Sequence, residues 1–446
     1  MTKRVTRQAL QVLSLHPDLQ RVEPLDLQIT LPPFVRANWR TGCSVETEWL
    51  TDISHGRETL VEDRRGGRIR PVRSFEATIT GLRIEDAHEV SEYAMTVCQD
   101  RNAMPIYSDR TAVGVTASSG ATVLECSTDY RRMYAGQRVA IVPIDFSTFE
   151  FDGILGRAMY AEIESVQSDR LTLASALQVD VPAGSYVYPM VDAQIELATQ
   201  IDVVGAQTVE ILLRYTEISG MSALPSSWVG PLSPFFPLND LDSRAIVSLR
   251  GNTDSDPESV TIAREGAVLQ SGRDATAYGA GSRARHLFSF GHLAKTREQA
   301  WSIIRLFDSC RGRVGTFWYV NPQTLWSAPF GLTSLDYIDV SPYGYASNVT
   351  RYWPNVSIEL LDGSMYARQI ESVSEVTVGG VDVHRITFSD PLPSSASSRL
   401  ERVTSAHLSR FTTDANRENW ITDEACLFHL DMTEVLDETA VVFTGV

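Results

Sequence analysis

The feature that most constrains this chain is an internal repeat. Residues 97–109 ("VCQDRNAMPIYSD") and residues 309–326 ("SCRGRVGTFWYVNPQTLW") share the same layout of Cys, Arg and Tyr. A shift of 212 residues (310 − 98) superimposes four pairs without a gap: Cys98 on Cys310, Arg73 on Arg285, Arg101 on Arg313 and Tyr107 on Tyr319. Self-similarity at a fixed spacing indicates a structural unit that is present twice.

Each copy reads as an extended segment, a helix and an aromatic strand. The second helix is predicted from an apolar face at positions i, i+3, i+4 and i+7, formed by Ala300, Ile303, Ile304 and Phe307. Thr296 with Gln299 has the spacing of a capping box at the start of that helix. The first copy has a similar stripe in "EDAHEVSEYAMTVC", made by Ala87, Val90, Ala94 and Val97. The strands that follow are "MPIYS" and "TFWYV".

The repeat continues downstream. Residues 159–161 and 365–367 both read Met-Tyr-Ala, and each triplet is followed by "ESV", an alternating strand and a turn rich in Pro, Ser and Ala. Short strands at regular spacing are typical of a small all-β module. Each module precedes a pair of closing strands, within "AQIELATQIDVV…VEILLRYTEI" and "AHLSRFTTDA…ACLFHLDMTEV".

These patterns predict a mainly β (α+β) chain with two tandem β-sandwich domains, each holding one helix and one inserted barrel-like module. The expected boundaries are an N-terminal arm (1–39), domain 1 (40–109 plus 190–219) with module 1 (110–189), domain 2 (220–322 plus 401–437) with module 2 (323–400), and a C-terminal tail (438–446). A chain of 446 residues has room for two to four domains.

Composition narrows the class of function. The formal charge is −17, without a basic block, whereas a surface that binds nucleic acid is normally basic. There is no apolar run of the ~18–20 residues that a membrane helix needs and no secretory signal pattern, so we expect a protein made in a cytoplasm. The five cysteines have no C-x-x-C spacing, so buried free thiols are expected rather than disulfides or a zinc ribbon.

The stretch 309–326 is expected to be the end of a helix that leads into a core strand. Arg311 and Arg313 lie where cations complement the helix macrodipole, and Trp318 and Tyr319 lie on opposite faces of the strand. Arg101 and Arg313 are expected to cap the helix or brace the core locally, or to contact a carboxylate of a neighbouring subunit. A catalytic role is not indicated, because no base or nucleophile accompanies them.

A segment crowded with Arg ("TEWLTDISHGRETLVEDRRGGRIRPVRSFEATIT"), then a helix, then "GTFWYVNPQTLW" resembles the tail-tube-like domains of tailed-phage tail-tip proteins, of the distal tail and baseplate-hub type. The resemblance covers most of the chain in two copies and rests on the fold pattern, without an invariant signature. It implies two tail-tube-like domains whose sheets join around a lumen that carries DNA.

In this family, single domains form six-membered rings, so a chain with two domains would give the same ring from three chains, with pseudo-sixfold symmetry. The resemblance implies a non-enzymatic virion protein at the tail tip, with itself, the tail tube and other tip proteins as partners, no cofactor and no membrane contact. A hexameric distal tail protein is the alternative assembly. The candidate subunit-contact or structural positions are the repeat residues Arg73, Arg285, Arg101, Arg313, Trp318, Tyr107 and Tyr319.

Enzyme motifs are not found: the chain lacks G-x-S-x-G, H-E-x-x-H, a Walker loop and G-x-G-x-x-G in a strand–helix context. The acid pairs Glu150 with Asp152 and Asp240 with Asp242 are expected by chance among 56 acids. The stretch "NTDSDPES" (252–259) has alternating oxygen ligands, but it lacks the Gly and distal Glu of a calcium-binding EF-hand loop. His286 and His292 would share a strand face, where packed or surface histidines are expected rather than metal ligands.

A receptor- or glycan-binding protein is the alternative from another class. The aromatics of "SPYGYASNVTRYWPN", Tyr343 and Tyr345 and above all Tyr352 and Trp353, would make a stacking platform for sugar. The same residues would also suit packing against a neighbouring domain or chain, because Tyr and Trp are common at subunit interfaces. Both interpretations remain open at this stage.

Overall fold

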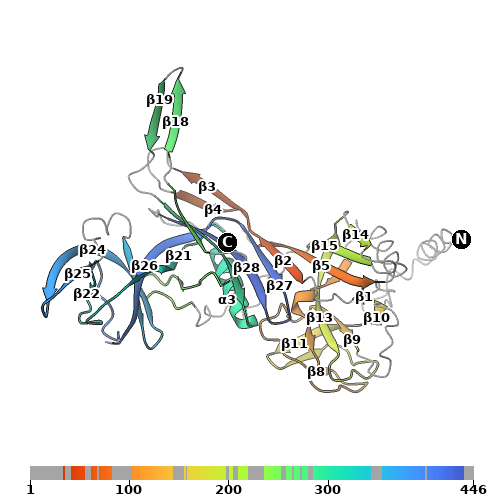
Figure 1. The fold of residues 1–446 in the computed structure, drawn as a ribbon. Helices are drawn as coiled ribbons and strands as arrows, with labels where there is room; N and C mark the ends of the chain where they lie inside the picture. Colours follow the sequence, from red (N-terminus) through yellow and green to blue (C-terminus); the bar gives the residue numbers. More distant parts are fainter. Residues whose placement is uncertain are drawn as a thin grey trace. The chain divides into compact units, whose positions relative to one another are not determined.

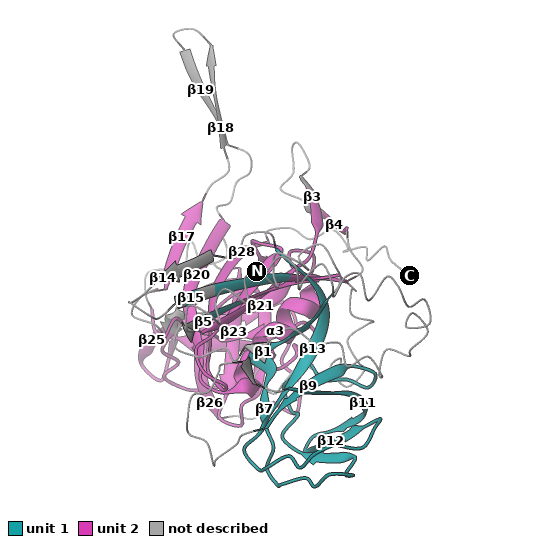
Figure 2. Cartoon of the chain, turned by 90° about the vertical axis from the view of Figure 1, so that its right-hand side faces the viewer, with its two compact units in different colours: residues 1–38, 77–215 teal, residues 39–76, 216–446 magenta. Residues whose placement is uncertain are grey.

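The structure is a computed structural model. It describes residues 34–35, 42–55, 62–67, 70–82, 102–143, 155–156, 158–196, 200–203, 209–218, 236–252, 258–263, 266–271, 274–279, 285–342, 354–396 and 399–435. Strands dominate these ranges, most pairs are antiparallel, and the expected mainly β fold is confirmed. Two compact units are formed by residues 1–38 with 77–215 and by residues 39–76 with 216–446 (Figure 2). In these ranges no helix has the length and apolar character needed to cross a membrane.

The second unit contains a run of antiparallel strands that pair in sequence. They are, in order of pairing, β17 (Ser259–Ala263), β20 (Arg285–Ala294), β28 (Cys426–Glu434) and β27 (Ala415–Trp420). Alternate residues of β20 and β28 point into the core, as Phe288, Phe290 and Phe428 do. This alternation is why "RHLFSFGHL" forms a strand that is covered on one face.

Helix α3 (Arg297–Cys310) covers that apolar face, beside β27 and β28 (Figure 1). The capping box is confirmed: the Thr296 hydroxyl accepts a hydrogen bond from the Gln299 N–H at 3.3 Å, and the Gln299 side chain accepts one from the Lys295 N–H at 2.9 Å. Each large apolar side chain of the helix that is buried here, such as Ile303 or Phe307, contributes about 1.5–3 kcal/mol. The helix ends where Arg311 adopts a left-handed backbone conformation.

The helix leads into β21 (Phe317–Trp326), which pairs with β26 (Leu400–Phe411) and, in parallel, with β16 (Ile246–Val247). Between β21 and β26 lie four strands with an apolar cluster of their own that includes Ile338, Ile358 and Phe388. These strands are β22 (Tyr337–Val340), β23 (Asn355–Leu360), β24 (Met365–Val378) and β25 (Val381–Phe388). They pair β22–β25–β24–β23–β26.

The first half of the chain has a similar inserted set of strands around a second apolar cluster, which includes Leu124, Ile141 and Leu171. The strands are β7 (Thr111–Ala112), β8 (Val123–Glu125), β9 (Arg138–Val142), β11 (Met159–Gln167) and β12 (Arg170–Leu173). Around them lie β5 (Val72–Leu82), β6 (Asn102–Pro105), β13 (Tyr186–Ile195), β14 (Gln200–Val203) and β15 (Val209–Glu217).

The remaining strands form short pairs. In the first half, β2 (Cys43–Glu48) and β5 flank the hairpin of β3 (Thr51–His55) with β4 (Glu62–Gly66). In the second half, β17 and β20 flank the hairpin of β18 (Gly266–Ser271) with β19 (Asp274–Gly279). A further two-stranded sheet joins β1 (Phe34–Val35) to β10 (Leu155–Gly156).

Both halves of the chain pair their strands in the same order. In the first half the pairs are β2–β5, β5–β15, β15–β14, β15–β13 and β13–β6. In the second half the corresponding pairs are β17–β20, β20–β28, β28–β27, β28–β26 and β26–β21. β11 and β24 both begin at the Met of the repeated Met-Tyr-Ala triplet. The repeat in the sequence thus corresponds to a repeat in the order of strand pairing.

The structure also departs from the sequence expectations. Residues 39–76 belong with the second unit, whereas domain 1 was expected to begin at residue 40, because β2 pairs with β27. Tyr107 lies in the 3₁₀ turn η2 (Tyr107–Asp109) and not in a strand like Tyr319, because β6 ends at Pro105. The expected first helix, with Cys98 and Arg101, lies outside the described residues.

Candidate assembly interface

The first half of the chain meets the second half at the pair β2–β27. Six residues of each strand are in antiparallel register, from Cys43 opposite Trp420 to Glu48 opposite Ala415. One face of the pair is buried, with Val45 of β2 and Trp420 of β27 both nearly inaccessible to solvent. On the other face Arg417 lies directly opposite Glu46. A strand of one repeat therefore completes the sheet of the other repeat.

The carboxylate of Asp414, in the loop between β26 and β27, stabilises this junction through hydrogen bonds. Asp414 accepts four hydrogen bonds: from the N–H and hydroxyl of Thr51 at 2.8 and 2.6 Å, and from the N–H and guanidinium of Arg313 at 3.0 Å each. The Arg313 guanidinium also donates to the Thr51 carbonyl at 3.0 Å. Arg313 thus links the end of α3 to the first-repeat segment that follows β2. Its partner carboxylate belongs to the same chain.

Close packing around the carboxylate constrains the turn after α3. Gly312 has φ +67°, and a Cβ at this position would lie 2.6 Å from Asp414 Oδ1 and 3.2 Å from the Trp49 Cβ. Trp49 belongs to the apolar cluster under α3, its backbone N–H donates to the Asp414 carbonyl at 2.8 Å, and its indole N–H donates to Asp308 at 3.3 Å. Only glycine satisfies both the backbone conformation and the contact distance here.

The electrostatics of Asp414 follow from these contacts. Burial alone would raise the pKa of Asp414, but the hydrogen bonds from the side chains and backbones of Arg313 and Thr51 hold it below its usual range. The carboxylate is therefore ionised at neutral pH, where the hydrogen bonds that it accepts are charge-assisted.

In each repeat, the strand that corresponds to β2 or β27 has fewer pairing partners than β2 and β27 themselves. By pairing order β17 corresponds to β2 and β14 corresponds to β27. Within the described residues β17 pairs with β20 alone and β14 with β15 alone. Ile262 of β17 is 66% exposed, whereas Val45 of β2 is covered. These edges present backbone groups that a further strand can pair with.

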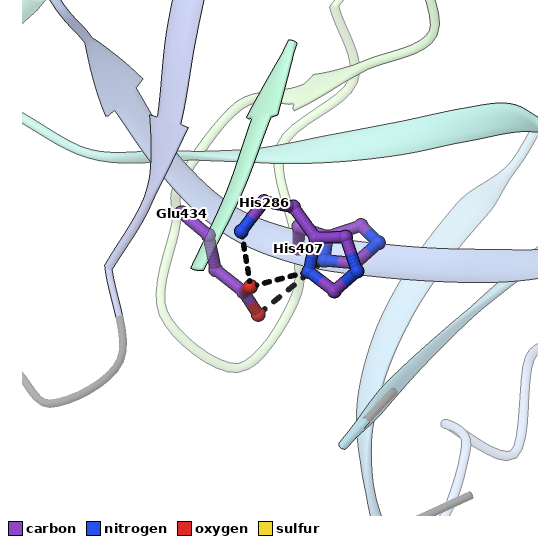
Figure 3. Close-up of side chains that lie close together, drawn as sticks. All are labelled: His286, His407 and Glu434. Carbon is purple, nitrogen blue, oxygen red and sulfur yellow. Dashed lines mark hydrogen bonds and ion pairs between the residues drawn. The ribbon is translucent and has the colours of Figure 1, made fainter. Parts of the chain in front are cut away.

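A buried cluster of titratable side chains lies where β20, β26 and β28 meet (Figure 3). His286 Nδ1 lies 2.7 Å from Glu434 Oε2, and the His286 backbone N–H donates to the same oxygen at 3.2 Å. His407 Nδ1 lies 3.3 Å from Glu434 Oε1, and the two imidazole rings are 4.6 Å apart. Phe288 packs against both rings and against Tyr319.

The histidines determine the charge state of the carboxylate. Burial alone would raise the pKa of Glu434, but hydrogen bonds from His286 and His407, together with their charge, hold it well below its usual range. Two imidazole nitrogens and a carboxylate oxygen within 4.8 Å of one another are also a donor set that suits a divalent metal such as Zn²⁺.

The first half of the chain has a buried carboxylate at the position that corresponds to Glu434, and comparing the two shows what their surroundings have in common. β15 and β28 are both nine residues long and both end in Thr-Glu. At the end of β15, Glu217 pairs with the buried Arg73 guanidinium at 3.6 Å, and Ser74 contacts Thr216. In the second half His286 contacts Glu434, and Leu287 lies opposite Thr433. A guanidinium does not ligate a metal, so the role common to both halves is to neutralise a buried carboxylate.

This match shifts the sequence alignment by one residue. Arg73 corresponds to His286 in the strand pairs, whereas the gap-free shift placed it on Arg285. Arg285 is also buried, at the first position of β20.

The other sequence candidates lie in separate places. Trp318 donates from its indole N–H to Asp242 at 2.9 Å, and the Tyr319 hydroxyl donates to Glu258 at 3.2 Å. Tyr107 stacks edge-on against Tyr188 in the first half. Arg73, Arg285 and Tyr319 lie near the two buried carboxylates, and among the candidates that the structure describes Arg313 alone reaches the β2–β27 junction. Arg101 and the glycan candidates Tyr343, Tyr345, Tyr352 and Trp353 lie outside the described residues.

The acid pairs and the possible calcium loop have internal partners where they are described. Asp240 accepts two hydrogen bonds from the buried Arg368 guanidinium at 2.8 and 2.7 Å. Asn252 exchanges hydrogen bonds with the backbone of Leu293. His292 Nδ1 donates to the Arg250 carbonyl at 2.8 Å and takes no part in the histidine cluster. Glu150, Asp152, Asp254 and Asp256 lie outside the described residues.

Sequence reasoning missed Asp414, Thr51, Trp49, His407 and Glu434. The repeated Thr-Glu at the ends of β15 and β28 is the one sequence signal that could have pointed to Glu434. Comparison of the chain with protein-family models and with curated proteins gives no match. The functional argument therefore rests on the geometry of the junction between repeats.

Proposed function

We propose that this protein is a structural component of a phage tail tip, in which three chains form a ring with six similar positions around a lumen. One observation carries the proposal: β2 of the first repeat completes the sheet of the second repeat by pairing with β27, although the two repeats share one pairing order. A contact that joins two similar units within a chain can recur between chains. Repetition of a heterologous contact gives either a closed ring or an open filament.

The ring would join the tail tube to the proteins of the tip. With two repeats per chain, three chains present six repeats to a sixfold tube and remain threefold toward the tip. The formal charge of −17 suits a lumen through which DNA passes without being bound, because anionic walls repel phosphate. On this proposal the protein acts through its shape and is not an enzyme. It is found in the virion, after synthesis in the host cytoplasm.

The proposal is tested by electron microscopy of the purified full chain. Class averages should show closed rings with threefold symmetry and six similar features around an open centre. Mixing the rings with purified tail tubes should place one ring at the end of each tube. Open filaments, or rings that never bind a tube, would contradict this function.

A further inference from the structure

We propose that His286, His407 and Glu434 form a binding site for one divalent transition-metal ion such as Zn²⁺. Two imidazole nitrogens and a carboxylate oxygen are ligands that such ions commonly take in proteins. The metal would join three strands, β20, β26 and β28, that come from distant parts of the sequence. The site lies within the second repeat of a single chain, so it does not depend on the proposed ring.

The donor atoms of the three side chains already face one another (Figure 3). His286 Nδ1 lies 2.7 Å from Glu434 Oε2, and His407 Nδ1 lies 3.3 Å from Glu434 Oε1. In a tetrahedral site with metal–ligand bonds of about 2.0–2.2 Å, neighbouring donor atoms are about 3.3–3.6 Å apart. The distance from His407 fits this spacing. A small rotation of the carboxylate would lengthen the distance from His286 by the roughly 0.6 Å that a metal needs.

The surroundings of the two histidines hold their rings in place. Phe288 packs against both rings, and His407 lies opposite Tyr319 in the strand pair β21–β26. The second ring nitrogen of His407, Nε2, lies 3.3 Å from the Ser405 hydroxyl. When Nε2 carries the hydrogen and donates it to this hydroxyl, Nδ1 keeps its lone pair for a metal. Histidines that ligate metals commonly have such a partner at the other nitrogen.

Burial distinguishes this site from histidines that bind metal ions adventitiously at a protein surface. The side chains of His286, His407 and Glu434 are 7%, 0% and 2% exposed. In the same sheet His429 lies 3.2 Å from Asp431, and these two side chains are 51% and 35% exposed. A metal held by buried ligands binds as the chain folds and leaves when this part of the structure opens. Slow release to a chelator is therefore expected.

The first repeat shows how the second repeat differs. There the Arg73 guanidinium pairs with Glu217 at 3.6 Å, and a guanidinium has no lone pair to offer a metal. In the strand pairs His286 takes the place of Arg73, and His407 also faces the carboxylate. Both repeats neutralise the equivalent carboxylate. The second repeat does so with two side chains that can also ligate a metal.

Metal content after folding is the first measurement. The full chain, without an affinity tag, is refolded with Zn²⁺ in excess, desalted and analysed by inductively coupled plasma mass spectrometry. About one Zn²⁺ per chain should remain, and EDTA should remove it slowly from native protein but rapidly in urea. Bound Zn²⁺ should also raise the melting temperature, because it binds the folded state. A wild-type chain that retains no Zn²⁺ would overturn the site.

The most informative variant is His286→Arg, because it copies the first repeat: it keeps a cation beside Glu434 and removes one ligand. It should fold, as judged by tryptophan fluorescence, and bind Zn²⁺ at least about 100-fold more weakly. His407→Gln removes the other imidazole and provides a second test if the first variant does not fold. Ser405→Ala should weaken binding about tenfold, because it removes the partner of a ligand. His429→Ala is the matched control and should keep the wild-type affinity.

The outcomes either support the site or overturn it. Loss of Zn²⁺ in folded His286→Arg or His407→Gln, with full retention in His429→Ala, supports it. Equal Zn²⁺ content in the wild type and in both ligand variants, or loss in His429→Ala alone, means that the ion binds at the surface and overturns it. Neither result changes the expected ring, which is tested separately by electron microscopy.

Discussion

Replacing Asp414 by Ala is expected to destabilise the second unit, because this carboxylate holds three segments together. Asp414 accepts four hydrogen bonds from Thr51 and Arg313, its side chain is 12% exposed, and that of Arg313 is 31% exposed. A hydrogen bond to a charged group contributes about 1.5–3 kcal/mol, and bonds that share one acceptor group are not additive. Arg313 can regain water when the partner is lost. The expected cost is therefore about 2–4 kcal/mol, well below the sum of four bonds.

The assay is urea and thermal unfolding followed by tryptophan fluorescence. Asp414→Ala should lower the melting temperature of the second unit by roughly 5–10 °C at an unchanged urea m-value. Asp414→Asn keeps one acceptor oxygen and should cost about half as much. A double-mutant cycle with Arg313→Ala should give a coupling energy of about 1–2 kcal/mol.

The matched control is Asp169→Ala. Asp169 also accepts two hydrogen bonds from a guanidinium, that of Arg170, but the side chains of this pair are 65% and 46% exposed, so no measurable change in stability is expected. If Asp414→Ala unfolded at the same urea concentration as the control, the assignment of Asp414 as the fastening group of the junction would be wrong.

Three further predictions concern other residues of the chain. Gly312→Ala should cost about 1–3 kcal/mol in unfolding experiments, because φ is +67° and the added Cβ would lie 2.6 Å from Asp414; a neutral result would contradict the packing described here. The pKa of Glu434 is lowered in the folded state, so its stabilisation is present at neutral pH and is lost as pH falls below the unfolded value of about 4.5. Glu434→Gln should therefore flatten the acid limb of a plot of stability against pH, and an unchanged limb would refute this. Burial raises the pKa of the Cys126 and Cys310 thiols to about 12, so neither should react with a thiol reagent at pH 8 until the chain is unfolded; rapid labelling of native protein would contradict their burial.

The sequence predicts local structure where a single segment determines its own conformation. The helix at 297–310 follows from the Thr296 cap, the spacing of Ile303, Ile304 and Phe307, and the glycine-containing turn after Cys310. The strand that begins at Arg285 follows from its alternating pattern, and the repeat follows from the Met-Tyr-Ala triplets that open β11 and β24.

The partners of these segments were not readable, because pairing depends on residues far apart in the chain. The pattern of β2 fits a half-buried strand, but it does not say that the partner is β27 of the other repeat. Glu434 lies on a strand whose alternation predicts an inward direction, whereas β26 is buried on both faces around His407, and only the sheet brings the two residues to His286. Asp414 lies in a loop with no local signal that would mark it as an acceptor of four hydrogen bonds.

The mass of the assembled protein tests the central claim most directly. Native mass spectrometry of the full chain, across a range of concentrations, should show a species of about 148 kDa, three times the 49.4 kDa of one chain. When this species dissociates, no assembly of two chains should be more stable than the assembly of three, because each contact in a closed ring supports the others. A monomer at every concentration, or an assembly whose mass is not three chains, would contradict the claim that two repeats per chain build a ring of six positions.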